Sequence, residues 1–427
     1  MTVDGSPSQN CADPSIIRAP DNTWYVFCTS DPLTSGGSFR LIPILRSSDL
    51  VSWQFVSDVF SARPAWVAAD SGLWAPAVEQ FGGTYFLYYS VSRTAADGRF
   101  AIGVATSTSP AGPWTDSGAP VVESQTTADC GAPLNNRWVI DPDVVQVGNL
   151  RYIIYGSFCG GISVRQLSAD GLRSDHAEIK IAAANRFEAA HVVERGGYFY
   201  LFLSANACCE GAASGYTVMV GRSQMITGPY LDKFGVDLNA SRPGGTFVMG
   251  ANGNRWIAPG HHASFTDFAN QDWAIYHAVD RNVPLFPGNG IRRPLMLDPL
   301  DWTADGWPVV RGGHGPSDSF MPRPAAQPGQ TTAYVAQFRA DESPGTALAD
   351  FSDEFTSSIP GRWSFAANRI SLTPFFLQNG ELVWGTQDAD IYGDIDNAAV
   401  YVQNAPTGDY MVEVKVALDV PASGCCF

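Results

Sequence analysis

The stretch FEAAHVVERGGYFYLFLS, residues 187–204, contains two apolar segments on either side of a tight turn. The first segment, AHVVE, is short, and the second, YFYLFLS, is rich in aromatic and aliphatic residues that favour β-strands. Between them, RGG is typical of a turn. The stretch therefore predicts two consecutive strands, with the charged residue Glu188 where the unit begins.

The same arrangement recurs four more times in the first three-quarters of the chain. The other aromatic segments are WYVFCTS from Trp24, YFLYYSV from Tyr85, RYIIYGS from Arg151 and WAIYHAV from Trp273. A turn precedes each of them, and a short apolar strand precedes each turn. We call the first residues of the five units openers, and they are spaced 47 to 73 residues apart at Asp13, Ala75, Asp141, Glu188 and His261.

A repeat of this length, with about four strands per unit, is typical of a β-propeller. Two later segments, IGVATSTSPAGPW and VMVGRSQMITGPY, match each other in register and add strands to their units. Long helical periodicity is absent. We therefore predict an all-β protein with a five-bladed β-propeller over residues 1–315. In a propeller the first strand of each blade lines the central channel, so the openers should converge on one mouth of it.

The composition argues against several classes of function. Lys and Arg total 26 and Asp and Glu total 42, which gives a net charge of −16 and disfavours nucleic acid or an anionic membrane as a partner. No apolar run approaches the length of about 18 residues that a transmembrane helix needs. The first residues lack the basic start and apolar core of a signal peptide, so we expect a mature form if the protein is secreted. We expect a monomer that acts on a neutral substrate.

The cysteines favour an oxidising compartment. Their number is even and none has zinc-finger spacing, although free buried thiols are an alternative. A sequon at Asn239 adds weak support for secretion. Cys11 and Cys28 flank the inner strands of the first unit and could form a disulfide bond if the geometry allows it. The other six are Cys130, Cys159, Cys208, Cys209, Cys425 and Cys426.

Three of the openers, Asp13, Asp141 and Glu188, carry carboxyl groups. A carboxylate beside apolar strand residues is costly unless it has a use. Two carboxyl groups that face each other across a sugar can hydrolyse a glycosidic bond, because one protonates the leaving oxygen and the other activates water. A third carboxylate nearby can raise the pKa of the acid by repulsion. A single Asp-Pro is more often a turn, but equivalent positions in a repeat favour a function.

Seven segments resemble glycoside hydrolase family 43, and most of all its arabinan endo-1,5-α-L-arabinosidases. They lie in order over residues 10–312 and read ADPSIIR, LWAPAV, VIDPDV, FEAAHVVERGGYFYLFLS, CCEGAASGYTVMVGRSQMITGPY, PGHHASF and DGWPVV. The resemblance implies a secreted enzyme that cleaves the arabinan of plant cell walls with inversion. It also implies that Asp13 is the general base, Glu188 the general acid, and Asp141 the carboxylate that tunes and orients that acid.

The resemblance further implies a calcium ion beside His261, at the centre of the channel. A single histidine cannot form a full protein cage, so water would complete the ligands of this ion. His262 is the less suitable choice. The expected substrate-binding residues lie near the openers and comprise the aromatic residues Trp74, Trp138 and Phe187, each of which could instead belong to the core, and the weaker polar candidates Ser157 and Asn206.

After the propeller, residues 316–347 are typical of a linker or a strap. Residues 348–427 show alternating strands that resemble the start of a concanavalin-like β-sandwich, which we expect to be incomplete. Such a module slightly favours an exo-acting α-L-arabinofuranosidase or β-xylosidase of the same family as the alternative function. A non-catalytic sugar-binding propeller is a second alternative, and the presence of all three carboxyl groups argues against it. An open groove is favoured, and the loop from Thr126 to Trp138 is the predicted wall if one end is closed.

Overall fold

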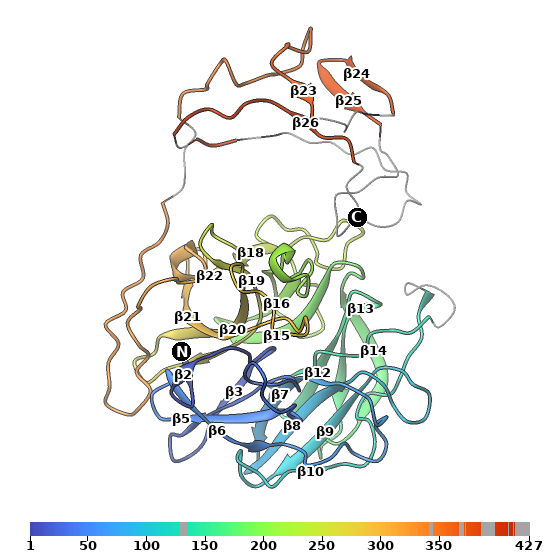
Figure 1. Ribbon diagram of the computed structural model, residues 1–427. Helices are drawn as coiled ribbons and strands as arrows, with labels where there is room; N and C mark the ends of the chain where they lie inside the picture. Colours follow the sequence, from blue (N-terminus) through green and yellow to red (C-terminus); the bar gives the residue numbers. More distant parts are fainter. Residues whose placement is uncertain are drawn as a thin grey trace. The chain divides into compact units, whose positions relative to one another are not determined.

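The computed structural model describes residues 1–128, 135–340, 345–366, 371, 373–385, 398–408, 410–412 and 414. It divides into two compact units, of which the first covers Met1–Arg339 and the second begins at Ala340. Each unit is built from β-strands (Figure 1). Among the described residues, no helix is both long and apolar enough to cross a membrane.

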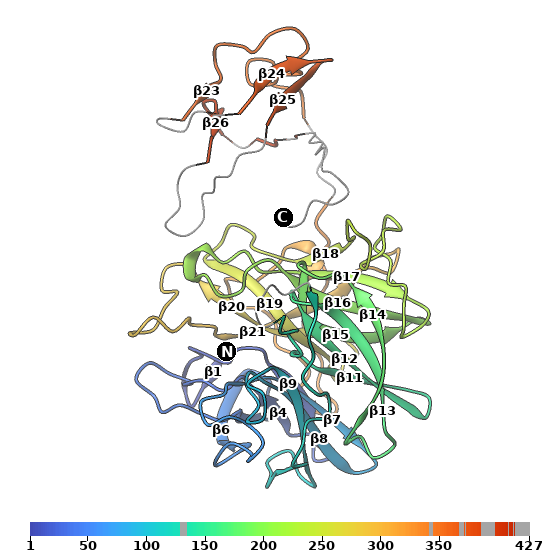
Figure 2. The same cartoon turned by 90° about the vertical axis from the view of Figure 1, so that its right-hand side faces the viewer.

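The first unit contains five sheets that follow one another in chain order (Figures 1 and 2). Blade 1 comprises β3 (Ser15–Arg18), β4 (Trp24–Phe27), β5 (Pro43–Ser47) and β6 (Ser52–Asp58), and its outer edge is extended by β1 (Thr2–Val3) and β2 (Ser6–Pro7). Blade 2 comprises β7 (Leu73–Phe81), β8 (Thr84–Val91), β9 (Ala101–Ser107) and β10 (Thr115–Asp116). Blade 3 comprises β11 (Asp143–Val147), β12 (Leu150–Ser157), β13 (Gly161–Leu167) and β14 (Ser174–Ala182).

Blade 4 comprises β15 (Phe187–Arg195), β16 (Tyr198–Ala205), β17 (Thr217–Ser223) and β18 (Thr246–Met249), with a short 3₁₀ turn, η2 (Gly211–Ala213), before β17. Blade 5 comprises β19 (Trp256–Thr266), β20 (Asp272–Asp280), β21 (Leu295–Trp302) and β22 (Pro308–Val310), followed by η3 (Arg311–Gly313). The first strands contact each other in the order β3, β7, β11, β15 and β19, and β19 returns to contact β3. They therefore surround one axis, and the predicted five-bladed propeller is confirmed.

The core lies between the blades, with one apolar cluster at each of the five junctions. Strand β8 shows how one strand serves two junctions. Leu87 and Tyr89 pack toward blade 1, whereas Phe86 and Tyr88 pack toward blade 3. Alternate side chains of a strand point to opposite faces, and both faces of these sheets are buried. This is why the second strand of each unit reads as a continuous aromatic and aliphatic run.

The ring is closed by side chains between blades 5 and 1, because each blade consists of its own consecutive strands. Apolar residues of both blades share one cluster, and the rings of Trp24 and Phe265 lie 4.9 Å apart. The segment after blade 5 also bridges this junction. The backbone N–H of Ala325 donates to Asp267 of blade 5, and Trp24 of blade 1 donates its indole N–H to the carbonyl of Ala326, each over 2.9 Å.

A disulfide bond joins Cys11 to Cys28, with Cα atoms 5.1 Å apart, as the sequence suggested. It connects the segment before β3 to the end of β4 and therefore fixes the start of blade 1. Cys208 and Cys209 are also joined to each other, and Cys159 is disulfide-bonded. Cys130, Cys425 and Cys426 lie outside the described residues.

The second unit contains two small sheets among its described residues. Strand β23 (Ser364–Phe365) pairs with β26 (Tyr401–Val402), and β24 (Phe375–Gln378) pairs with β25 (Glu381–Trp384). Four aromatic rings pack between the sheets with centroids 4.8 to 6.3 Å apart, from Phe365, Phe375, Trp384 and Tyr401.

Candidate active site

The openers share an unusual backbone conformation. Positive φ angles of 45° to 55° occur near the start of the first strand in blades 1 to 4, at Asp13, Ala75, Asp141 and Ala189, and in the middle of β19 in blade 5, at His261. In blade 4 the residue concerned is Ala189, which directly follows the opener Glu188. Residues other than glycine rarely adopt positive φ, and such strain persists only where the surrounding structure holds it.

Each of these strained residues donates its backbone N–H to a side chain of the preceding blade. We call these contacts inter-blade clasps. The donor and acceptor pairs are Asp13 with His277 Nδ1 (3.1 Å), Ala75 with Thr29 Oγ1 (2.8 Å), Asp141 with Ser90 Oγ (2.8 Å), Ala189 with Asp141 Oδ2 (3.1 Å) and His261 with Ser204 Oγ (3.0 Å). The clasps run around the whole ring and tie the region of each opener to the preceding blade.

Asp13 is surrounded by groups that stabilise its charge. Thr29 donates its hydroxyl to Oδ2 over 2.6 Å, and the side chains of Arg293 and His261 lie 3.3 and 3.2 Å from Oδ1. Burial alone would raise the pKa of Asp13, but Arg293 and His261 hold that pKa well below its usual value. Asp13 is therefore an ionised carboxylate, which is the form that a general base requires.

The two histidines beside Asp13 carry different charges. His277 has no exposed surface, and burial lowers its pKa to about 3, so it is neutral and its Nδ1 can accept the N–H of Asp13. Burial also acts to lower the pKa of His261, but the negative charges of Asp13, Asp141 and Glu188 raise it to about 9. His261 is thus the cation that these three carboxyl groups share.

Glu188 has a different set of partners. Tyr216 donates its hydroxyl to Oε1 over 2.7 Å, and Ser157 donates its hydroxyl to Oε2 over 2.9 Å. Burial raises the pKa of Glu188 more than these two hydrogen bonds lower it, and the negative charge of Asp13 raises it further. Glu188 consequently keeps its proton to a higher pH than an ordinary glutamate, as a general acid must.

Asp141 stands between the two. Its Oδ2 accepts the N–H of Ala189, directly beside Glu188. Burial raises the pKa of Asp141 to about 7, and the charges of Glu188 and Asp13 add to this rise although His261 opposes it. Asp141 therefore interacts electrostatically with both of the other carboxyl groups, and its clasp fixes the backbone next to Glu188.

The predicted aromatic residues have different environments. The half-buried Trp74, at the start of β7, is followed by Phe100 and Trp138 in one row, with ring centroids 6.4 and 6.0 Å apart. Trp138 is 38% exposed and can offer a ring face to a ligand. Phe187 is 0% exposed in the cluster between blades 3 and 4, so the structure corrects this candidate from a sugar-stacking to a core residue.

The predicted polar residues also differ in position. Ser157 is fully buried and contacts Glu188, so it supports that carboxyl group and does not face a sugar. Asn206 is exposed, and its amide donates to the carbonyl of Gly215 and the hydroxyl of Thr217. His262 is 5% exposed and packs its ring 4.8 Å from that of Phe202, in line with its lower rank as a metal ligand.

Sequence reasoning missed Thr29, Tyr216, His277 and Arg293. Two of these carry a signal in the repeat, since a polar residue stands near the end of the second strand in every unit, at Thr29, Ser90, Ser157, Ser204 and His277. A comparison of the five aromatic segments could have found it. Tyr216 and Arg293 lie in segments between strands, where the repeat predicts nothing.

Comparison with known proteins agrees with this geometry. A family model described as "Glycosyl hydrolases family 43" matches residues 7–308. The chain belongs to this family. It is therefore a glycoside hydrolase, and the resemblance noted in the sequence is confirmed.

Curated relatives include two extracellular bacterial enzymes. The extracellular exo-α-(1→5)-L-arabinofuranosidase of Cellvibrio japonicus is 32% identical over 72% of this chain and 88% of its own length. The extracellular endo-α-(1→5)-L-arabinanase 1 of Bacillus subtilis is 32% identical over 71% of this chain and 88% of its own. The two relatives thus differ in their named mode of action, endo or exo.

Solved structures show the same fold. The family 43 endo-arabinanase of Bacillus licheniformis aligns with 72% of this chain and 100% of its own, with 30% identity and a TM-score of 0.59. The α-L-arabinanase of Cellvibrio cellulosa complexed with arabinohexaose aligns with 71% of this chain and 96% of its own, with 29% identity and a TM-score of 0.58.

Proposed function

We propose that the protein is a secreted endo-1,5-α-L-arabinanase that hydrolyses plant arabinan with inversion. The observation that carries this proposal is a group of three buried, interacting carboxyl groups in which Arg293 and His261 hold the pKa of Asp13 low while burial raises the pKa of Glu188. Relatives named as arabinanases support the substrate, and the arabinohexaose complex of one of them supports an oligosaccharide ligand. Relatives named as extracellular support secretion.

In the proposed reaction, Asp13 accepts a proton from water while the water oxygen attacks the anomeric carbon. Glu188 gives its proton to the glycosidic oxygen as the bond between that oxygen and the anomeric carbon breaks. Attack from the face opposite the leaving oxygen inverts the configuration. Asp141 orients the acid by accepting the N–H of Ala189 beside Glu188, and Thr29 and Arg293 orient the base.

The products released from linear 1,5-arabinan distinguish endo from exo cleavage. We expect early digestion to give oligosaccharides of mixed length and a rapid fall in polymer size, measured by size separation. Release of arabinose alone with little change in polymer size would indicate the exo-enzyme. The Cellvibrio japonicus relative is named as an exo-acting enzyme of this kind. Hydrolysis of xylosides but not arabinosides would indicate a β-xylosidase, and binding without hydrolysis a sugar-binding protein.

Substitution of the two proposed catalytic groups should have different consequences. Asp13→Asn and Glu188→Gln should each lower kcat on arabinan by about 10²–10⁴-fold. An aryl arabinoside with a good leaving group should restore part of the activity of Glu188→Gln, because that leaving group needs little protonation, but not that of Asp13→Asn. Wild-type turnover in both variants would refute the assignment, and NMR detection of a retained configuration in the first product would refute inversion.

Tyr216 should set the alkaline limit of activity. Its hydrogen bond stabilises the carboxylate form and so lowers the pKa of Glu188. Tyr216→Phe should raise that pKa, keep the acid protonated to higher pH, and move the alkaline limb of kcat/KM upward. Tyr230→Phe is the matched control, since this buried tyrosine donates to the carbonyl of Ile226. An alkaline limb that stays in place or moves downward in Tyr216→Phe would contradict this role.

We also propose a calcium ion beside His261. Nδ1 of His261 faces Asp13 over 3.2 Å, which is the outer-shell contact typical of a metal-binding histidine whose Nε2 binds the ion. No group of three or more His, Cys, Asp or Glu side chains among the described residues could hold a metal, so most ligands would be water. When bound, the ion would supply positive charge beside three carboxyl groups, where His261 otherwise holds a proton.

Metal analysis tests this proposal. We expect about one calcium ion per chain, its removal by a chelator with loss of activity, and recovery when calcium is restored. His261→Ala should bind no ion, whereas His314→Ala, at an exposed position, should bind it normally. An ion-free protein whose activity a chelator does not change would exclude the site.

For the C-terminal part we propose the start of a concanavalin-like β-sandwich over residues 348–427, after a linker over 316–347. The two small antiparallel sheets and their shared aromatic cluster support it. Residues 415–427 of this part lie outside the described residues.

A further inference from the structure

The exposed ring of Trp138 lies at the end of the aromatic row and three residues before Asp141 in the chain. Trp138 is also one of the predicted substrate-binding residues, so its position matters for sugar binding. Trp138 belongs to the long segment between β10 and β11, of which residues 129–134 lie outside the described residues. A long segment of this kind needs specific contacts to keep one side chain in place.

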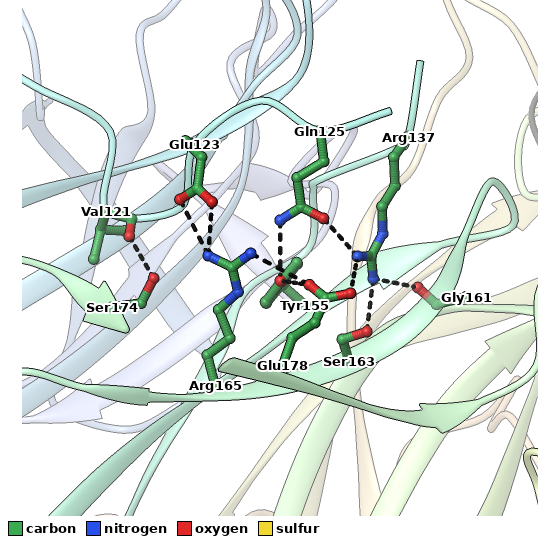
Figure 3. Close-up of polar contacts among 10 residues, drawn as sticks. All are labelled: Val121, Glu123, Gln125, Arg137, Tyr155, Gly161, Ser163, Arg165, Ser174 and Glu178. Atoms are coloured by element: carbon green, nitrogen blue, oxygen red, sulfur yellow. Dashed lines mark hydrogen bonds and ion pairs between the residues drawn. The ribbon is translucent and has the colours of Figure 1, made fainter. Parts of the chain in front are cut away.

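The preceding residue, Arg137, supplies such contacts (Figure 3). Its guanidinium donates to Gln125 Oε1 over 2.5 Å, to Glu178 Oε1 over 2.5 Å and to Ser163 Oγ over 2.7 Å. Arg137 itself is only 5% exposed. Gln125 belongs to the same segment as Arg137, whereas Ser163 and Glu178 belong to β13 and β14. One buried arginine therefore ties both ends of the segment to blade 3.

A second arginine completes this ionic network. Arg165 contacts Glu123 over 3.0 Å and Glu178 over 3.3 Å, and Tyr155 donates its hydroxyl to Glu178 over 2.5 Å (Figure 3). Glu178 thus accepts from three side chains and holds the two arginines together. The two arginines are buried, whereas the side chains of Glu178 and Glu123 are 31% and 43% exposed. A buried arginine occupies a defined position because leaving it unpaired is costly.

The backbone between Arg137 and Trp138 fixes the orientation of Trp138 once Arg137 is held in place. Arg137 reaches into blade 3, while the next side chain contacts Phe100 of the segment before β9. The N–H of Val139 donates to the carbonyl of Arg137 over 3.0 Å, and this γ-turn centred on Trp138 fixes the direction of one side chain relative to the other. The N–H groups of Arg137 and Trp138 donate to the carbonyls of Gln125 and Cys159 over 3.1 and 3.0 Å, which holds both residues in this orientation.

Glycine at position 160 makes room for the arginine. A Cβ atom at Gly160 would lie 2.7 to 2.9 Å from side-chain atoms of Arg137, closer than packed atoms approach each other. The arginine thus packs directly against the backbone that leads from β12 into β13. This close fit distinguishes Arg137 from an ordinary surface arginine.

We propose that Arg137 and Glu178 are positioning residues that hold Trp138 as a substrate-binding surface next to Asp141. This inference rests on the proposed function and on the sequence prediction that Trp138 binds the substrate. Neither residue touches the reacting atoms, so their loss should weaken binding of the polymer and leave the chemical step largely intact.

A double-mutant cycle with Trp138 tests this coupling. Trp138→Ala and Arg137→Met should each raise KM for linear arabinan by about tenfold, the scale of one lost aromatic contact, with kcat within about twofold of wild type. In the Trp138→Ala background, Arg137→Met should add little to KM, because its effect acts through the missing ring. Arg195→Met, which breaks a 2.9 Å ion pair with Asp272 between blades 4 and 5, is the control and should leave KM unchanged.

Additive effects on KM in the double variant, or an unchanged KM in Arg137→Met, would overturn the proposal. If Arg137→Met does not fold, Glu178→Gln and Arg137→Lys enter the same cycle, since lysine keeps the charge but cannot form the same fork of hydrogen bonds. An unchanged KM in Trp138→Ala would refute substrate contact by this ring and the present inference with it. The proposed function itself would fail separately, in the Asp13 and Glu188 variants.

Discussion

The contact between Asp13 and blade 5 is the interaction on which the rest of the site depends. Among the described residues no strand of one blade completes another, so the junction of blades 5 and 1 closes by packing, by polar side chains and by the backbone N–H of Cys11, which donates to the carbonyl of Arg293. Two of those side chains, His261 and Arg293, bring positive charge to the carboxylate of Asp13, and the neutral His277 accepts its backbone N–H. A buried carboxylate stays ionised only when donors and cations surround it. Closure of the ring supplies those groups, so the base exists only in the assembled propeller.

The other blades are joined by similar contacts, in which the acceptors are mostly neutral hydroxyl groups. A strained residue in or just before each first strand turns its N–H toward the preceding blade, and a buried N–H needs an acceptor. Hydroxyl groups of Thr29, Ser90 and Ser204 fill this role at three junctions. The clasps thus stabilise the conformation that aims the openers at the axis. Asp13 and His261 are distant in sequence, yet they meet because every blade repeats the same contact, in which a backbone N–H donates to a side chain of the preceding blade.

The sequence predicts the propeller well because both faces of every blade are buried, which gives each second strand an unmistakable apolar run. It also predicts the openers, since their register repeats with the strands. The prediction that Phe187 stacks against a sugar was wrong, and the alternation of side chains along the strand explains why. If Glu188 points to the axis, its neighbour in a strand must point into the core between blades. Arg293 and Tyr216 could not be predicted, because they reach the carboxyl groups from irregular segments that only tertiary packing places.

Burial acts on Asp13 and Glu188 alike, so the difference between base and acid must come from their partners. Asp13 has an arginine and a protonated histidine beside it, whereas Glu188 has two neutral hydroxyl groups. A cation in place of Tyr216 would ionise Glu188 and remove the proton that the leaving oxygen needs. An apolar residue there would raise the pKa of Glu188 and make its proton harder to transfer. Neutral donors lie between these limits, so the phenol of Tyr216 suits an acid that must both hold and release its proton.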